Sequence, residues 1–537
     1  MSKTNRKQTF LGGAAVLAMA TAIVKVIGAI YKIPLNQLLG KSGFGYFNTA
    51  YDIYAVLLMV STTGLPVAMS RMISESRTLG RTKQIRQIYR VSRLVFLILG
   101  AVGAGGMAIL CKQLAALMSQ KESWFAILCL SPAVLFISFI SADRGYFQGQ
   151  SNMMPTSISQ VLEALAKLAV GLLAAWIFKK KTGSMVYAAG GAILGVTVST
   201  LVSAIYLNWK RRRAAAELEA EECLDDTVLS RKTTAKTLLS IAIPITLGAA
   251  GMQLIIAIDA AVYMARLKGA AGFTSAHADD VKGIYNFCQT IFNMPCAFIT
   301  PLTISVIPAI TEQLTRRAHK SAKTVAESAI RVTSLIAMPC SIGLIVLAEP
   351  IMGFLGGYRG ADLALAANLM RILGACVLIN SLVLIVTAVL QAHGYVYIPV
   401  LNLAIGGIVK VIVNFVLVGN PKINIVGAPI GTLACYLLIS ALDVFALRRV
   451  LRHPPAVMRN LYRSGLAAVV MGAAAFGAER LLRAAGLSAM LRTAGAMLAA
   501  VVVYVGMVLV LKVITADDCK LLPKGDKIAK LLKITKN

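Results

Sequence analysis

Apolar residues recur along the chain in runs of about 20, and short polar stretches separate them. A helical run of this length crosses the hydrocarbon core of a bilayer. The pattern therefore predicts about fourteen membrane-spanning helices and leaves no room for a folded soluble domain. The expected spans are 10–31, 46–70, 93–118, 123–142, 157–178, 185–208, 238–265, 284–309, 332–355, 367–390, 397–418, 424–447, 464–481 and 491–514.

Composition supports this interpretation. Of the 537 residues, 58% are hydrophobic and only 14% are charged, and the mean hydropathy is +0.75. Soluble domains average about 45–50% apolar and about 25% charged residues. The chain is therefore predicted to be an all-α polytopic membrane protein. Its basic and then apolar start, MSKTNRKQTFLGG, lacks a convincing cleavage site after it and is interpreted as the beginning of the first span.

The charge distribution predicts the orientation. A net charge of +31 would indicate nucleic-acid binding in a soluble protein. Here Lys and Arg concentrate in alternate loops, as the positive-inside rule describes for the cytoplasmic side. We therefore expect a multi-pass protein with both termini in the cytoplasm and no nucleic-acid partner.

The chain also shows an internal repeat. A shift of 243 residues carries Gln148 onto Gln391 and Lys167 onto Lys410, and a shift of 237 carries Glu75 onto Glu312. Both halves begin on the same side of the membrane, so the repeat is parallel. We expect two pseudo-symmetric lobes of six helices, followed by two further helices. The predicted parts are an N-terminal lobe (1–208), a cytoplasmic linker (209–236), a C-terminal lobe (237–447), and spans 13 and 14 with a basic cytoplasmic tail (448–537).

Several polar residues lie within the predicted spans. An ionisable side chain in a span is costly to insert and normally faces protein or water. The candidates for a central cavity are Lys25, Gln160, Glu163, Lys167, Asn402, Lys410 and Asn414, together with Lys32, which directly follows the first span. Span 7 adds Asp259. A water-filled cavity with a basic lining suits an anionic substrate, and phosphate is the obvious anion.

Each of these residues also has a structural interpretation. Lys32 can extend from near the end of its span to the outer interface. Glu163 and Lys167, four residues apart on one helix, can pair with each other. Asp259 can serve as a structural hydrogen-bond acceptor.

Enzyme signatures are absent from the sequence. The four histidines are scattered in loops, there is no HExxH or GxxxxGK[ST] motif, and none of the nine cysteines form a CxxC pair. We therefore expect no enzymatic activity and no resident cofactor. Transport would be driven by a gradient of Na⁺ or H⁺, by the membrane potential or by the substrate gradient.

The segment RGYFQGQSNMMPTSISQVLEALAK resembles the signature of the stage V sporulation protein B and YtgP group. KQTFLGGAAVL and GLPVAMSRMISE look similar to that group too. The group belongs with MurJ-type lipid II flippases in the multidrug/oligosaccharidyl-lipid/polysaccharide exporter superfamily. The motif positions in this chain are Arg144, Gly145, Gln148, Gly149 and Pro155.

The resemblance implies two six-helix lobes around a V-shaped cavity, as in MATE and MurJ proteins, with alternating access. It implies a flippase for an undecaprenyl-pyrophosphate-linked oligosaccharide, foremost the peptidoglycan precursor lipid II, in cell-wall or spore-cortex synthesis. Lys25 matches an essential basic residue of span 1, and Lys167 stands where the motif has Arg. Asp259 lies in the span that contributes to a sodium site in some relatives, whereas span 11 has Asn402 and Asn414 in place of the companion acid.

The same resemblance implies a bacterial cytoplasmic membrane protein that acts as a monomer, with the bilayer, a lipid-linked oligosaccharide and possible cell-wall synthesis proteins as partners. Two other functions remain open at this point. One is a cation-coupled multidrug exporter of the same superfamily, whose cavity should be acidic or apolar. The other is a scaffold for wall-synthesis proteins, which needs no charge in a cavity.

Overall fold

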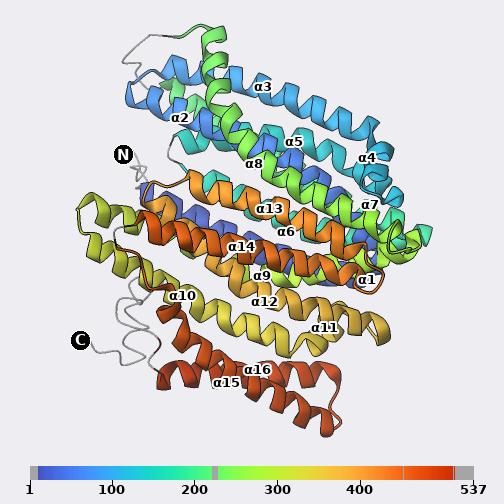
Figure 1. Cartoon of the computed structure of the whole chain (residues 1–537). Coiled ribbons are helices and arrows are strands. Elements are labelled where there is room, and N and C mark those ends of the chain that lie inside the picture. Colours follow the sequence, from blue (N-terminus) through green and yellow to red (C-terminus); the bar gives the residue numbers. More distant parts are fainter. Residues whose placement is uncertain (1–9, 151, 221–227, 452, 512, 514–537) are drawn as a thin grey trace, which may run out of the picture. The chain divides into compact units, whose positions relative to one another are not determined.

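The computed structural model describes residues 10–150, 152–220, 228–451, 453–511 and 513. These residues form helices and no strand, so the predicted all-α class is confirmed (Figure 1). The first nine helices are α1 (Phe10–Thr62), α2 (Gly64–Thr78), α3 (Thr82–Ile109), α4 (Cys111–Leu117), α5 (Trp124–Gly149), α6 (Met154–Thr182), α7 (Met185–Ala220), α8 (Arg231–Lys268) and α9 (Ser275–Thr315). The others are α10 (His319–Val346), α11 (Ala348–Gly356), α12 (Gly360–Ala392), α13 (Tyr397–Val418), α14 (Gly427–Val450), α15 (Val457–Ala484) and α16 (Ala489–Val510).

Helix α1 consists of two segments. Its 53 residues would extend about 80 Å at 1.5 Å per residue, far more than the hydrocarbon core of a bilayer. Gly40, with φ of 67° and ψ of −174°, interrupts the helical backbone between them. The positive φ is readily adopted by glycine, which has no Cβ. The two segments correspond to the first predicted span and to most of the second.

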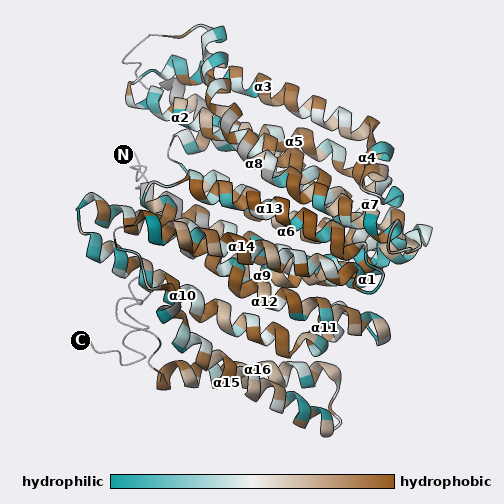
Figure 2. Ribbon diagram, viewed as in Figure 1, coloured by the Kyte–Doolittle hydropathy of each residue, from teal (hydrophilic) through white to brown (hydrophobic). Residues whose placement is uncertain are grey.

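Each predicted span overlaps a helix of the structure. Among the described residues, eleven segments are long and apolar enough to cross a membrane. Such segments are typical of a multi-pass membrane protein, while the count of fourteen spans stays a prediction. Figure 2 shows hydrophobic residues along the middle of many helices and hydrophilic residues at many of their ends.

The chain divides by its internal contacts into two compact units. The first comprises residues 1–268 and 273–283, and the second comprises residues 269–272 and 284–537. Helix α8 therefore groups with the first unit, where it packs against α1, α2 and α3. This division lies later in the chain than the predicted linker at 209–236, and the lobe boundaries drawn from the sequence stay a prediction.

Helix boundaries in the two units follow the repeat found in the sequence. A shift of 237 residues carries both ends of α3 onto both ends of α10, and the start of α4 onto the start of α11. A shift of 243 carries the end of α5 onto the end of α12, and the start of α6 onto the start of α13. The packing corresponds as well, because α3 contacts α5 as α10 contacts α12, and α6 contacts α7 as α13 contacts α14.

Candidate functional site

The first unit contains a cluster of charged and aromatic side chains inside its membrane helices. The ammonium group of Lys167, on α6, lies 5.8 Å from the ring centre of Tyr31 and 6.0 Å from that of Tyr51. These tyrosines lie on the two segments of α1, on either side of the break at Gly40. Aromatic faces attract a cation with about 0.5–2 kcal/mol. Lys167 therefore contacts both segments of α1.

Two further charges belong to this cluster. Lys32 is half-buried on α1 and interacts electrostatically with Lys167, which repels it, and with Asp52, which attracts it. Two lysines and one aspartate leave an excess of one positive charge at this place. We call Tyr31, Lys32, Tyr51, Asp52 and Lys167 the lysine cluster.

Glu163 pairs with a partner outside its own helix. Arg144, the first residue of the family motif, donates from Nη2 to Oε2 of Glu163 at 3.0 Å and from Nε to Oγ of Ser159 at 3.1 Å. The structure thus joins Glu163 to α5, and Lys167 to the tyrosines of α1. The i, i+4 pair considered from the sequence is not the arrangement that these side chains adopt.

The motif glycines bring α5 close to α2. A Cβ on Gly149 would lie 2.7 Å from Cβ of Ile73, and one on Gly145 would lie 3.2 Å from Cα of Pro66. Real Cβ atoms essentially never approach a neighbour within 3.0 Å, so Gly149 has no room for a side chain. These two motif positions therefore serve helix packing.

The other motif positions lie around the break between α5 and α6. Pro155 is buried in the first turn of α6, where proline is favoured because its missing N–H has no helical partner. Gln148, in the last turn of α5, and Gln160, on α6, are half-buried. The motif thus combines a tight contact with α2, an ion pair with α6 and a helix start.

Two predicted residues lie elsewhere in the first unit. Lys25 is exposed on α1, seven residues before Lys32. Asp259 is buried on α8, with 4% of its surface exposed. No group of three or more His, Cys, Asp or Glu side chains that could hold a metal ion occurs among the described residues. The assignment of sodium to Asp259 stays a prediction.

The second unit has a different polar arrangement around α13. Asn402 donates to Oδ1 of Asp443 at 2.8 Å, and Thr387 donates to Oδ2 of the same carboxylate at 3.1 Å. Asp443 is fully buried on α14 and joins α12, α13 and α14. Asn414 is also fully buried and packs against Gly431 of α14. Lys410, which lies between Asn402 and Asn414 on α13, is half-buried. The two asparagines thus contact α14.

The repeat relates the polar contacts of the two units. The shift of 243 residues carries Arg144 onto Thr387, Ser159 onto Asn402 and Lys167 onto Lys410. In the first unit the arginine bonds the serine directly, and in the second unit Asp443 bridges the threonine and the asparagine. In each unit, these polar contacts therefore link equivalent helices at corresponding positions. A half-buried lysine, Lys167 in the first unit and Lys410 in the second, lies about two turns further along its helix.

A second cluster in the first unit was missed by sequence reasoning. Lys282, just before the predicted span 284–309, is fully buried and donates to Thr49, which donates to Gln120. Asp279 pairs with Lys268 at 3.3 Å. Burial lowers the pKa of Lys282 below its ordinary value, and nearby carboxylates oppose this. Lys282 was missed because it lies outside the predicted spans.

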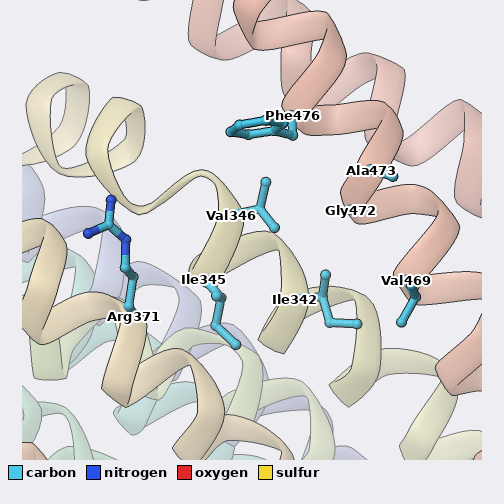
Figure 3. A pocket seen from close by; sticks show the side chains of 8 residues that line it. All are labelled: Ile342, Ile345, Val346, Arg371, Val469, Gly472, Ala473 and Phe476. Carbon is cyan, nitrogen blue, oxygen red and sulfur yellow. The ribbon is translucent and has the colours of Figure 1, made fainter.

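The second unit also contains a groove, with a volume of about 510 Å³, that no sequence pattern indicated. Its walls are the apolar side chains of α10 and α15, and Arg371 of α12 lies at one edge (Figure 3). The lining residues are Ile342, Ile345, Val346, Arg371, Val469, Gly472, Ala473 and Phe476. Arg371, like Asp443, is a charged residue inside a predicted apolar span. Both could therefore have been recognised from the sequence as candidate functional residues.

The apolar helices and the repeat define a multi-pass membrane protein built from two related units. The model of the family described as "Polysaccharide biosynthesis protein" matches residues 10–314, which is more than half of the chain. The chain belongs to this family. A model described as "MatE" matches residues 273–416.

Similarity to known proteins covers nearly the whole chain. Stage V sporulation protein B of Bacillus subtilis is 25% identical over 521 residues, or 96% of this chain and 98% of that protein. Lipid II flippase MurJ of the same organism is 24% identical over 475 residues, or 86% of each chain. The solved structure "Lipid II flippase MurJ, inward closed conformation" superimposes with a TM-score of 0.67, at 11% identity, over 92% of this chain and 98% of that one. The predicted MurJ-like fold is confirmed.

Proposed function

We propose that this protein moves an undecaprenyl-pyrophosphate-linked oligosaccharide across the bacterial cytoplasmic membrane by alternating access, with lipid II as the leading candidate. Both termini would face the cytoplasm. The observation that carries the proposal is the lysine cluster, which holds an excess positive charge inside membrane-spanning helices. Such charges are costly in a membrane protein and mark substrate pathways.

The lysine cluster suits a pyrophosphate. Lys32 and Lys167 repel each other, and a bound anion would relieve that repulsion. Lysine binds phosphate as a point charge, so it tolerates the changing orientations of a substrate in transit. The contacts with Tyr31 and Tyr51 hold Lys167 while no anion is present. Since a cation–π contact is weaker than an ion pair in a desolvated place, the anion would displace it.

Other polar residues extend the proposed cavity. Lys25 would add positive charge on α1, and Gln160 and Glu163 would face the same space as Lys167 on α6. In the second unit, Lys410 would supply the positive charge at the position that the repeat relates to Lys167. Asn402 and Asn414 contribute through α13, whose position they fix against α14. Asp259 would couple transport to Na⁺ or H⁺. The polyprenyl tail would stay in the lipid.

A cation-coupled multidrug exporter is the second candidate, since part of the chain matches the MatE family model. A site for cationic drugs needs a negative excess, whereas the lysine cluster has a positive one. Raised drug susceptibility of a deletion strain with normal wall precursors would favour the exporter.

The decisive experiment is complementation. The chain is expressed in a bacterium depleted of its own lipid II flippases, and exposure of lipid II on the outer leaflet is measured. We expect growth and exposure to return. Stable insertion without exposure would count against lipid II and would favour another lipid-linked glycan or a requirement for a sporulation-specific partner. Measuring exposure during growth and during sporulation separates a role in the vegetative wall from one in the spore cortex.

A further inference from the structure

A groove in the first unit lies on α3, α5 and α7. Its volume is about 230 Å³. It is lined by Arg93, Phe136, Phe139, Asp143, Leu201, Ala204, Ile205 and Asn208. None of these residues belongs to the lysine cluster, so the groove is a separate feature of the same unit.

The polar end of the groove lies where the apolar part of each helix begins. Arg93 is the last of the basic residues in the first turns of α3, and the apolar sequence LVFLILGAVGAGG follows it. Asn208 immediately precedes Trp209, an exposed residue of the type enriched at the membrane interface. Phe136 precedes Asp143 on α5 by about two turns, and Leu201 precedes Asn208 on α7 by about two turns, so both lie away from the polar ends. The groove therefore runs from the interface into the apolar layer.

The charges at the polar end do not cancel. Asp143 accepts a hydrogen bond from Tyr89 at 2.8 Å and pairs with Arg211 at 3.6 Å. Arg211 also donates to the side-chain oxygen of Asn208 at 2.9 Å, which leaves the amide nitrogen of Asn208 as a donor. Two arginines with one aspartate leave one excess positive charge.

Arg93 supplies that excess. Its guanidinium group lies 6.0 Å from the ring centre of Tyr89 and 5.7 Å from that of Phe139. In the part of the chain that the structure describes, it forms no ion pair within 4.0 Å. The aromatic rings position the guanidinium at the groove without neutralising it.

We propose that this groove binds a bilayer phospholipid with an anionic headgroup. The phosphate would contact Arg93 and the amide nitrogen of Asn208, and one acyl chain would lie along Phe136, Leu201 and Ile205. Basic pockets between helices on the cytoplasmic side are suited to anionic headgroups, because that leaflet carries a negative surface potential. Leu201 and Ile205 are 38% and 61% exposed, so an acyl chain would cover apolar surface that the protein leaves open.

The proposal rests on the predicted orientation, which places the basic end of α3 in the cytoplasm. It does not require that the protein transports lipid II. The phospholipid would be a resident ligand whose phosphate neutralises the excess positive charge of Arg93. The proposed substrate would instead bind at Lys32 and Lys167. The two sites can therefore be tested independently.

The test uses the fluorescence of Trp209, next to Asn208. The full chain with Trp124→Phe and Trp176→Phe, which leaves Trp209 as its single tryptophan, is reconstituted in phosphatidylcholine vesicles. Phosphatidylglycerol brominated on its acyl chains is added in steps, and brominated phosphatidylcholine is added in a parallel series. We expect saturable quenching by the phosphatidylglycerol at low mole fraction. Arg93→Gln should raise its half-saturating fraction about five- to tenfold.

Two controls make the result specific. Arg90→Gln removes the same charge from the same helix, three residues away and outside the groove lining, and should leave the half-saturating fraction within about twofold. A variant with only Trp176, on α6, should show quenching that does not depend on Arg93.

Three outcomes would overturn the proposal. Equal quenching by the two lipids would remove headgroup selectivity. An equal effect of Arg93→Gln and Arg90→Gln would indicate general surface attraction. Displacement of phosphatidylglycerol by a polyprenyl pyrophosphate at equimolar amounts would assign the groove to the transported lipid instead.

Discussion

Arg144 of α5 and Glu163 of α6 form an ion pair with 3.0 Å between Nη2 and Oε2. Their side chains are only 14% and 25% exposed, so each charge is partly removed from water. The pair connects the end of α5 with α6 across the short break between these helices. Loss of either partner would leave the other as a half-buried, uncompensated charge.

A double-mutant cycle tests this relationship. We expect Arg144→Gln and Glu163→Gln each to lower the free energy of unfolding by about 1–3 kcal/mol. The double variant should lose less than the sum of the two, because neither charge is then left unpaired. Denaturant unfolding of the purified protein in detergent measures all four species. Strict additivity would show that the two side chains do not depend on each other.

The lysine cluster predicts a graded effect on transport. Lys167→Ala should reduce lipid II exposure at least about tenfold, since a contact worth about 1.4 kcal/mol changes an equilibrium tenfold. Lys167→Arg should retain most of the exposure, because it keeps the charge. Lys180→Gln removes a lysine from the same helix at a distance from the cluster, where it contacts Trp176, and serves as the matched control. If the Lys167→Ala variant exposed as much lipid II as the wild type at equal protein level, Lys167 would not be part of the substrate site.

The motif glycine at position 149 predicts a packing defect. Gly149→Ala would place its Cβ 2.7 Å from Cβ of Ile73 and 2.9 Å from the carbonyl oxygen of Ser70. Overpacking of this kind costs about 1–3 kcal/mol. Gly105→Ala is the control, because a Cβ at Gly105, within α3, meets nothing within 4 Å, and alanine favours a helix. We expect the melting temperature to fall for the first variant only. Equal stability of the two variants would contradict the close contact between α5 and α2.

Sodium coupling predicts a difference between two buried carboxylates. If Asp259 binds Na⁺, the ion should raise the melting temperature of the wild type, and Asp259→Asn should abolish that shift. Asp443→Asn should retain it, because the Asp443 carboxylate already accepts hydrogen bonds from Asn402 and Thr387. Potassium at equal concentration controls for ionic strength. If only Asp443→Asn abolished the rise in melting temperature caused by Na⁺, the sodium site would be assigned to Asp443 in the second unit.

The fold was largely predictable because an apolar run long enough to cross a membrane leaves a strong signal in the sequence. The starts of α10 and α13 also follow from the repeat. The partner of Glu163 was not predictable, because Lys167 at i+4 satisfies the local spacing rule and only the packing of α5 beside α6 brings Arg144 into reach. Arg371 and Asp443 could have been found, since each interrupts an apolar run, but the surroundings of each depend on packing between helices distant in sequence.

The coincidence of helix boundaries in the two units has a consequence for the history of this chain. Matching ends at two nearly equal offsets are the mark of a tandem gene duplication. Because the offset grows from 237 to 243 residues, the duplication was followed by an insertion between α11 and the end of α12 or by a deletion between α4 and the end of α5. An ancestor with an even number of crossings has both ends on one side of the membrane. Two copies of it could be fused head to tail without inverting either, and each copy then became free to specialise.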